Sequence, residues 1–158
     1  KDVAKQYDPE TVEAVVAHGN TDLKVETVQC LEEYHFKFAS IISCRAYISP
    51  FAEIGAGCII NPHAAIMANA RVEDHVIVHS QVVIEHDNQI GSYTNIAPGV
   101  SFGGNVKVGS RTKIYTGAAI IPQIQIGSDC TIAAGAVVTK DVRRQQTVAG
   151  VPAKPMTR

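Results

Sequence analysis

Residues 78–96 read VHSQVVIEHDNQIGSYTNI, and Ile or Val occupies every sixth position of this stretch, at 78, 84, 90 and 96. The same spacing runs in both directions, from Ile42 to Val138, without an insertion, and only Phe102 in this series is neither Ile nor Val. A helix repeats about every 3.6 residues and a plain strand about every two, so a period of six fits neither alone. A short flat strand followed by a corner fits six residues, and three such sides close one coil of 18 residues.

Hexapeptide periodicity therefore predicts a parallel β-helix and a mostly β fold. Successive coils pair about 4.8 Å apart, so residues 18 positions apart stack. In the interior column that contains Thr94 and Thr112, we expect the two hydroxyls to bond each other. A second inward residue, mostly small, is expected four positions after each of the first, at Ala46, Ala52, Cys58, Ala64, Ala70, Val76, Val82, Asn88, Thr94, Val100, Val106, Thr112, Ala118, Ile124, Cys130, Ala136 and Val142.

The chain before the repeat follows a different pattern. An apolar run at 12–17 ends at Gly19-Asn20 and predicts a buried strand and its turn. Residues 21–34 contain no Pro or Gly and carry Leu23, Val28, Leu31 and Tyr34 at helical spacing, which predicts a helix capped by Asn20 or Thr21. Residues 36–42 alternate like a strand.

We thus expect three parts. Residues 1–41 form a partial α/β subdomain, residues 42–143 form the β-helix, and residues 144–158 form an extended arm, rich in Pro and Gly, over the end of the prism.

Composition excludes several classes of function. The net charge is -1 with no basic block, so nothing indicates nucleic-acid binding. No apolar run approaches the ~20 residues of a membrane span, and no signal peptide is recognisable. The four cysteines are scattered without zinc spacing, which favours a reduced, cytoplasmic setting. Cys58 and Cys130 lie four coils apart, roughly 19 Å on that spacing, too far for a disulfide.

The most distinctive side chain of the repeat is His86, which lies between Glu85 and Asp87. Histidine is the usual general base near neutral pH, and either acid could orient it. Gly104 follows His86 by 18 residues, so stacking places a bare backbone over the imidazole, where its N–H could bind an oxyanion. A base beside an oxyanion donor indicates acyl transfer.

A metal site is the competing interpretation. His63, His75, His79 and His86 are clustered in the sequence, and prisms of the γ-carbonic anhydrase type hold zinc between subunits. No two histidines here differ by 18 or 36 positions, so they do not stack. We therefore expect no metal, and we expect four of the histidines on the surface: His18, His35, His63 and His75.

Three segments resemble the left-handed β-helix sugar acetyltransferases, namely residues 83–91, 103–109 and 150–154. The similarity is closest to bacterial UDP-4-amino-sugar N-acetyltransferases of the bacillosamine pathway, with sialic acid O-acetyltransferases as cousins. Residues 16–20 and 36–50 resemble the end of that family's nucleotide-sugar subdomain, so we expect residues 1–41 to be a remnant of it. The family's opening strand and glycine-rich turn are not in this sequence, so either the sequence is truncated or the acceptor differs.

The resemblance implies roles for five residues. His86 would take a proton from a sugar amine or hydroxyl, and Asp87, where relatives often have Glu, would orient it. The Gly104 N–H would face the acetyl thioester carbonyl. Asn95 falls where relatives carry a second histidine near the acetyl group, and His79 falls near the sugar-binding position.

The resemblance also implies the substrates and the assembly. Acetyl-CoA would be the co-substrate, with Thr116 and Ala134 along the pantetheine path and Lys154 near the phosphates. The acceptor would be a nucleotide-linked amino sugar or a sialic-acid-like sugar. The coil would be left-handed, and the protein a homotrimer with sites between protomers. The remaining alternatives are the metalloenzyme above and a non-catalytic trimeric scaffold that lacks an acceptor domain.

Overall fold

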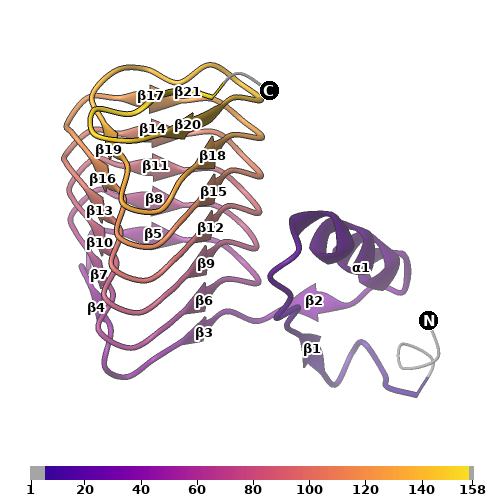
Figure 1. Cartoon of the computed structure of the whole chain (residues 1–158). Helices are drawn as coiled ribbons and strands as arrows, with labels where there is room; N and C mark the ends of the chain where they lie inside the picture. Colours follow the sequence, from indigo (N-terminus) through magenta and orange to yellow (C-terminus); the bar gives the residue numbers. More distant parts are fainter. Residues whose placement is uncertain (1–5, 157–158) are drawn as a thin grey trace.

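The computed structural model describes residues 6–156, which form a three-sided prism with a small subdomain beside its lower end (Figure 1). The strands of the prism are two residues long and recur every six residues. They are β3 (Ile41–Ile42), β4 (Tyr47–Ile48), β5 (Glu53–Ile54), β6 (Ile59–Ile60), β7 (Ala65–Ile66), β8 (Arg71–Val72), β9 (Ile77–Val78), β10 (Val83–Ile84), β11 (Gln89–Ile90), β12 (Asn95–Ile96), β13 (Ser101–Phe102), β14 (Lys107–Val108), β15 (Lys113–Ile114), β16 (Ala119–Ile120), β17 (Gln125–Ile126), β18 (Thr131–Ile132) and β19 (Val137–Val138).

Every third strand belongs to the same face of the prism. The six-stranded face runs β4-β7-β10-β13-β16-β19, the five-stranded face runs β5-β8-β11-β14-β17, and the eight-stranded face contains β3-β6-β9-β12-β15-β18 and then β20 and β21. Neighbouring strands are parallel and shifted by one coil, so that Val83 pairs with Ser101 and Ile84 with Phe102. The predicted coil of 18 residues is thus confirmed.

The interior is a column of mostly β-branched side chains. From Cys58 onward both inward positions of each repeat are buried, and Ile66, Ile84, Ile90 and Ile96 have no exposed surface. Burying one such side chain stabilises the fold by about 1.5–3 kcal/mol.

The expected bond between the two inward threonines is wrong. Thr94 and Thr112 instead donate to the backbone carbonyls of Gly109 (3.3 Å) and Gly127 (2.9 Å) in the next coil, because these carbonyls lie in the corner that each side chain faces.

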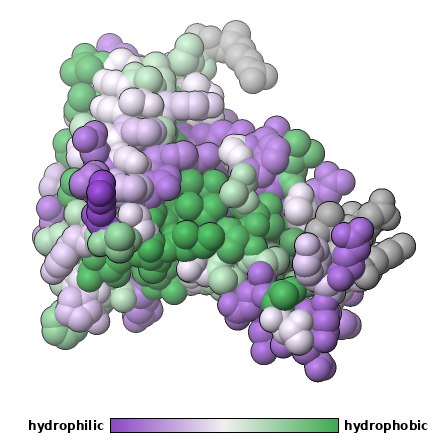
Figure 2. All heavy atoms as spheres, turned by 90° about the horizontal axis from the view of Figure 1, so that it is seen from below, coloured by the Kyte–Doolittle hydropathy of each residue, from purple (hydrophilic) through white to green (hydrophobic). Residues whose placement is uncertain are grey.

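The lower end of the prism departs from the predicted burial. Ile42 is 43% exposed, although its place in the repeat predicts an inward side chain. No coil of the described chain lies below it, so inward residues of the first coil have no partner on one side. Together with Ile41, Tyr47 and Phe51, it contributes to an apolar surface at this end, which Figure 2 shows from below.

The subdomain has the predicted strand–helix–strand order: β1 (Glu13–Ala14), α1 (Thr21–Glu33) and β2 (Lys37–Phe38). Strands β1 and β2 pair in parallel, and the Asn20 side chain caps α1 by accepting from the N–H groups of Asp22 and Leu23. The alternating run at 36–42 is two strands rather than one. Strand β2 pairs with β1, whereas β3 begins the prism, because the chain crosses from the subdomain to the prism between them.

Helix α1 packs on the corner between the five- and eight-stranded faces, which we call the His75 corner. The buried side chains of the helix are Thr21, Lys24 and Val28, whereas Leu23 is 48% exposed. The Lys24 ammonium donates to the His75 carbonyl at 2.6 Å. The predicted apolar stripe is therefore only partly right, because polar residues of the first turns make the contact with the prism.

His75 itself lies under this helix and is 4% exposed, so its predicted surface position is wrong. Its ring stacks on Tyr93 with centroids 5.0 Å apart and meets Phe38 edge-on at 4.7 Å. Arg111, in the same corner, bonds Asp22 of the helix and Asp129 of the next coil. These contacts join two segments far apart in the sequence.

The segment after the repeat closes the top of the eight-stranded face. Strand β20 (Thr147–Ala149) pairs in parallel with β18, Thr131 opposite Thr147, and β21 (Lys154–Pro155) turns back antiparallel to β20. The last coil is thus 16 residues long instead of 18. Within the described residues no helix is long and apolar enough to cross a membrane.

Burial of Lys24 predicts a pH-dependent stability. Burial lowers the pKa of its ammonium from 10.5 to about 8. The unfolded chain therefore holds this proton up to pH 10.5 while the folded chain releases it near pH 8, so this residue makes the free energy of unfolding rise between the two values, by about 3 kcal/mol in total. Urea unfolding of wild type and Lys24→Met at pH 7.5–10.5 measures this rise, which the variant lacks. Lys107→Met, on an exposed strand, serves as the control and keeps the rise; equal slopes in wild type and Lys24→Met would contradict the assignment.

Candidate active site

His86 and Asp87 form the turn between β10 and β11, at the corner between the six- and five-stranded faces, which we call the His86 corner. Asp87 has a left-handed backbone (φ 61), as do residues at the same place in many other turns of the prism. Both side chains are exposed. The repeat thus presents them outward because inward positions are taken by the neighbouring strands.

Asp87 holds the imidazole. The His86 Nδ1 lies 2.7 Å from Asp87 Oδ2, and the amide of Asn69, one coil earlier, donates to Asp87 Oδ1 at 3.2 Å. These hydrogen bonds, that from His86 being the larger cause, lower the pKa of the Asp87 carboxyl, so it is ionised near neutral pH. An ionised carboxylate requires a donor at Nδ1, which leaves the lone pair on Nε2. Of the two acids considered, Asp87 orients the ring; no hydrogen bond joins Glu85 to it in the described chain.

Gly104 lies over the other edge of the ring, as the spacing predicts. A methyl group built on Gly104 would lie 2.6 Å from both Cε1 and Nε2 of His86, so only glycine fits there without displacing the imidazole. Within residues 6–156 no acceptor is found for the Gly104 N–H. The corner therefore combines an oriented base with a backbone donor one coil above it.

A second group of predicted residues meets in a pocket of about 220 Å³ on the eight-stranded face. His79 and Asn95 line it, together with Gly19 of the subdomain. Asn61 bonds His79 Nδ1 at 3.4 Å, and the Asn95 amide donates to the Gly19 carbonyl at 3.4 Å. The subdomain thus forms one wall of this pocket.

Sequence reasoning missed two members of this pocket, Lys113 and Tyr115. Lys113 follows Asn95 by one coil and Tyr115 follows His79 by two, so the rule of 18-residue stacking contained the signal. Lys113 is the only Lys or Arg side chain that lines the pocket.

The two groups lie at opposite edges of the six-stranded face within one chain. His79 lies where the chain leaves the eight-stranded face, and His86 lies where it leaves the six-stranded one. Thr116 and Ala134 stack on one another at the corner next to His79, where the Gly135 N–H donates to the Thr116 carbonyl at 2.9 Å; we call this the Thr116 corner. Lys154 is exposed on β21 at the top of the eight-stranded face. A single chain therefore does not bring all predicted site residues together.

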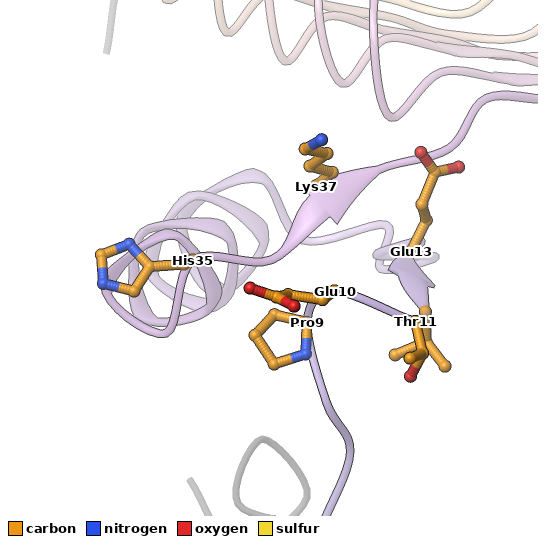
Figure 3. Close-up of a pocket in the computed structure, with 7 residues that line it drawn as sticks. Pro9, Glu10, Thr11, Glu13, His35 and Lys37 are labelled. Atoms are coloured by element: carbon orange, nitrogen blue, oxygen red, sulfur yellow. The ribbon is translucent and has the colours of Figure 1, made fainter.

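The largest hollow lies elsewhere. A pocket of about 640 Å³ in the subdomain is lined by the segment 9–13 and by His35 and Lys37 (Figure 3). None of the predicted site residues lines it. Among the described residues, no group of three or more His, Cys, Asp or Glu side chains is arranged to hold a metal ion.

Comparison with known proteins gives this arrangement a family. Residues 51–86 and 105–140 match the model for bacterial transferase hexapeptide (six repeats). The acetyltransferase domain of PglB from Neisseria gonorrhoeae, solved with acetyl coenzyme A, superposes with a TM-score of 0.94 and 33% identity over 98% of this chain and 75% of that one.

Two further solved structures agree. PerB from Caulobacter crescentus, in complex with CoA and GDP-perosamine, gives a TM-score of 0.89 and 30% identity over 90% of this chain and 69% of that one. WeeI from Acinetobacter baumannii gives 0.86 and 28% over the same shares. The repeat, the fold and these similarities together show that the chain belongs to the hexapeptide-repeat sugar acyltransferases, the family of left-handed β-helix enzymes.

Proposed function

We propose that this protein transfers the acetyl group of acetyl-CoA to an amino group on a nucleotide-linked sugar, with His86 as the general base. The observation that carries the proposal is the stacking of Gly104 over an imidazole held by Asp87. The named relatives support the choice of substrates, since PerB was solved with CoA and GDP-perosamine and the PglB domain with acetyl coenzyme A.

The geometry supports direct transfer. Nε2 of His86 takes a proton from the sugar amine as its nitrogen attacks the thioester carbonyl, and the Gly104 N–H stabilises the oxygen that becomes negative. When the C–S bond breaks, the imidazolium returns the proton to the departing thiolate of CoA. Asp87 stays ionised throughout and stabilises the imidazolium. No covalent bond to the protein is needed, and the products are the N-acetyl sugar and free CoA.

A homotrimer would complete the site, and the six-stranded face supports it. The outward side chains of this face carry no charge; they are Tyr47, Ala65, Val83, Ser101, Ala119 and Val137. The outward side chains of the five-stranded face, in contrast, are all polar or charged: Glu53, Arg71, Gln89, Lys107 and Gln125. An uncharged flat face is the one that packs against another copy at the least desolvation cost.

Packing three six-stranded faces around an axis brings the two separated groups together. The His86 corner of one protomer then meets the Thr116 corner of the next, because these two corners bound the packed face. The thioester would lie between them, with Thr116 and Ala134 along the pantetheine. His79, Asn95 and Lys113 would face the acceptor or the acetyl group, and Lys154 would meet the CoA phosphates.

Removal of the base is the direct test. His86→Asn is expected to lower kcat for acetylation of GDP-perosamine and of UDP-4-amino sugars by about 10²–10⁴-fold, because proton removal from the amine loses its acceptor. Release of CoA, followed with a thiol reagent, measures the rate. His63→Asn replaces an exposed histidine at another corner and should leave kcat unchanged. Full activity of His86→Asn would refute the role of this residue.

A methyl group at Gly104 tests the second half of the site. Gly104→Ala is expected to lower kcat at least about tenfold, because its Cβ would overlap the His86 ring and displace it. The double variant with His86→Ala separates this cause from general damage. If the methyl group acts through the imidazole, Gly104→Ala costs much less in the background that lacks the ring; equal costs in both backgrounds would contradict that mechanism.

A charge on the packed face tests the assembly. Ala119→Glu, in the middle of the uncharged face, should convert the trimer to monomers and abolish turnover, since a buried carboxylate without a partner is strongly unfavourable. Sedimentation velocity measures the mass. Gln89→Glu adds the same charge to the five-stranded face and should leave the mass unaltered; a trimeric Ala119→Glu protein would place the interface elsewhere.

A further inference from the structure

Asn88 is a polar residue in an apolar column of the core. It has no exposed surface, and the inward positions that stack with it at 18-residue intervals carry Ala70, Val106 and Ile124. An amide buried among aliphatic side chains is costly unless all its hydrogen-bonding groups are satisfied. Its presence in this column therefore calls for a local reason.

The amide of Asn88 links two turns of adjacent coils. Its Nδ2 donates to the carbonyls of Glu85 (2.9 Å) and Gly103 (3.0 Å). Its Oδ1 accepts from the N–H of Val106 at 2.5 Å. The first turn, 85–88, carries His86, and the second, 103–106, carries Gly104. One side chain thus bonds both turns that make up the site.

Other turns of this corner are closed differently. In the two coils below, the N–H of Ala52 donates to the Ser49 carbonyl at 3.0 Å and that of Ala70 to the Met67 carbonyl at 3.3 Å. In the His86 turn the Asn88 side chain takes the place of such a backbone bond to Glu85, and in the next turn it takes the place of the acceptor for Val106. The spacing and shape of both turns consequently depend on one amide.

We propose that Asn88 is a positioning residue that sets the separation between the His86 imidazole and the Gly104 N–H. This inference rests on the proposed function, in which the base and the oxyanion donor act on the same carbonyl group. Displacement of either by a fraction of an ångström misaligns the attack and weakens the hydrogen bond to the oxyanion.

Thr112 provides a matched control because it makes the same kind of link away from the His86 corner. Its hydroxyl donates to the Gly127 carbonyl at 2.9 Å and accepts from the Cys130 N–H at 3.2 Å, at the His75 corner. If Asn88 only stabilises the fold, replacing either residue should have the same consequences. If Asn88 positions the site, only its replacement should change catalysis.

The experiment compares Asn88→Ala with Thr112→Ala in steady-state acetylation and thermal unfolding. Asn88→Ala is expected to lower kcat at least about tenfold with little change in the KM of either substrate, because the groups that bind them remain. The pH profile of kcat should keep its shape, since the bond between His86 and Asp87 is retained. Thr112→Ala should lower Tm by a similar amount and leave kcat within about twofold. Equal kcat losses in the two variants would overturn the proposal.

Two additions keep the test decisive. Asn88→Asp keeps the volume of the side chain and the acceptor for Val106 but loses the Nδ2 donor to both carbonyls, so it should show the same loss of kcat if Asn88→Ala fails to fold; undiminished kcat overturns the proposal. Crystal structures of wild type and Asn88→Asp should show Gly104 displaced relative to His86, and an unchanged separation would also overturn it. Wild type without turnover on any acceptor would refute the proposed function instead, and the structural comparison would still decide the role of Asn88.

Discussion

The stacking of each residue on the one 18 positions later is the constraint on which the rest of this structure depends. Each coil makes its strand bonds with the coils above and below, as Val83 does with Ala65 and Ser101. A slip by one residue would turn every inward Ile and Val outward, so the register is held wherever the interior is filled. A filled interior also leaves no internal cavity, and chemistry must take place at the corners and between faces.

The His86 corner shows how a repeat can build a site without a cleft of its own. Its parts come from successive coils at one place in the prism: Asn69 below, His86 and Asp87 in the middle, and Gly104 above. The vertical spacing of coils sets the distance between base and oxyanion donor. Asn88 adds a link from inside the core, so that both sides of the corner are fixed.

The helix on the opposite corner serves a different purpose. Through Lys24, Asp22 and the aromatic contacts of His75, α1 is fixed to the prism at a set height. Gly19, just before the helix, is thereby held as one wall of the pocket that contains His79 and Asn95. The subdomain thus contributes to the predicted acceptor side, while the prism supplies the base.

The sequence by itself determined everything that follows from periodicity: the coil length, the placement of Gly104 over His86, and the neighbouring Asp87 as its partner. Tertiary structure alone decided the burial of His75, the exposure of Leu23 and Ile42, the partners of Thr94 and Thr112, and the links made by Asn88. The first group depends on register, which an uninterrupted repeat fixes locally. The second depends on which distant segment or carbonyl packs against a given side chain, and such contacts leave no periodic mark in the sequence.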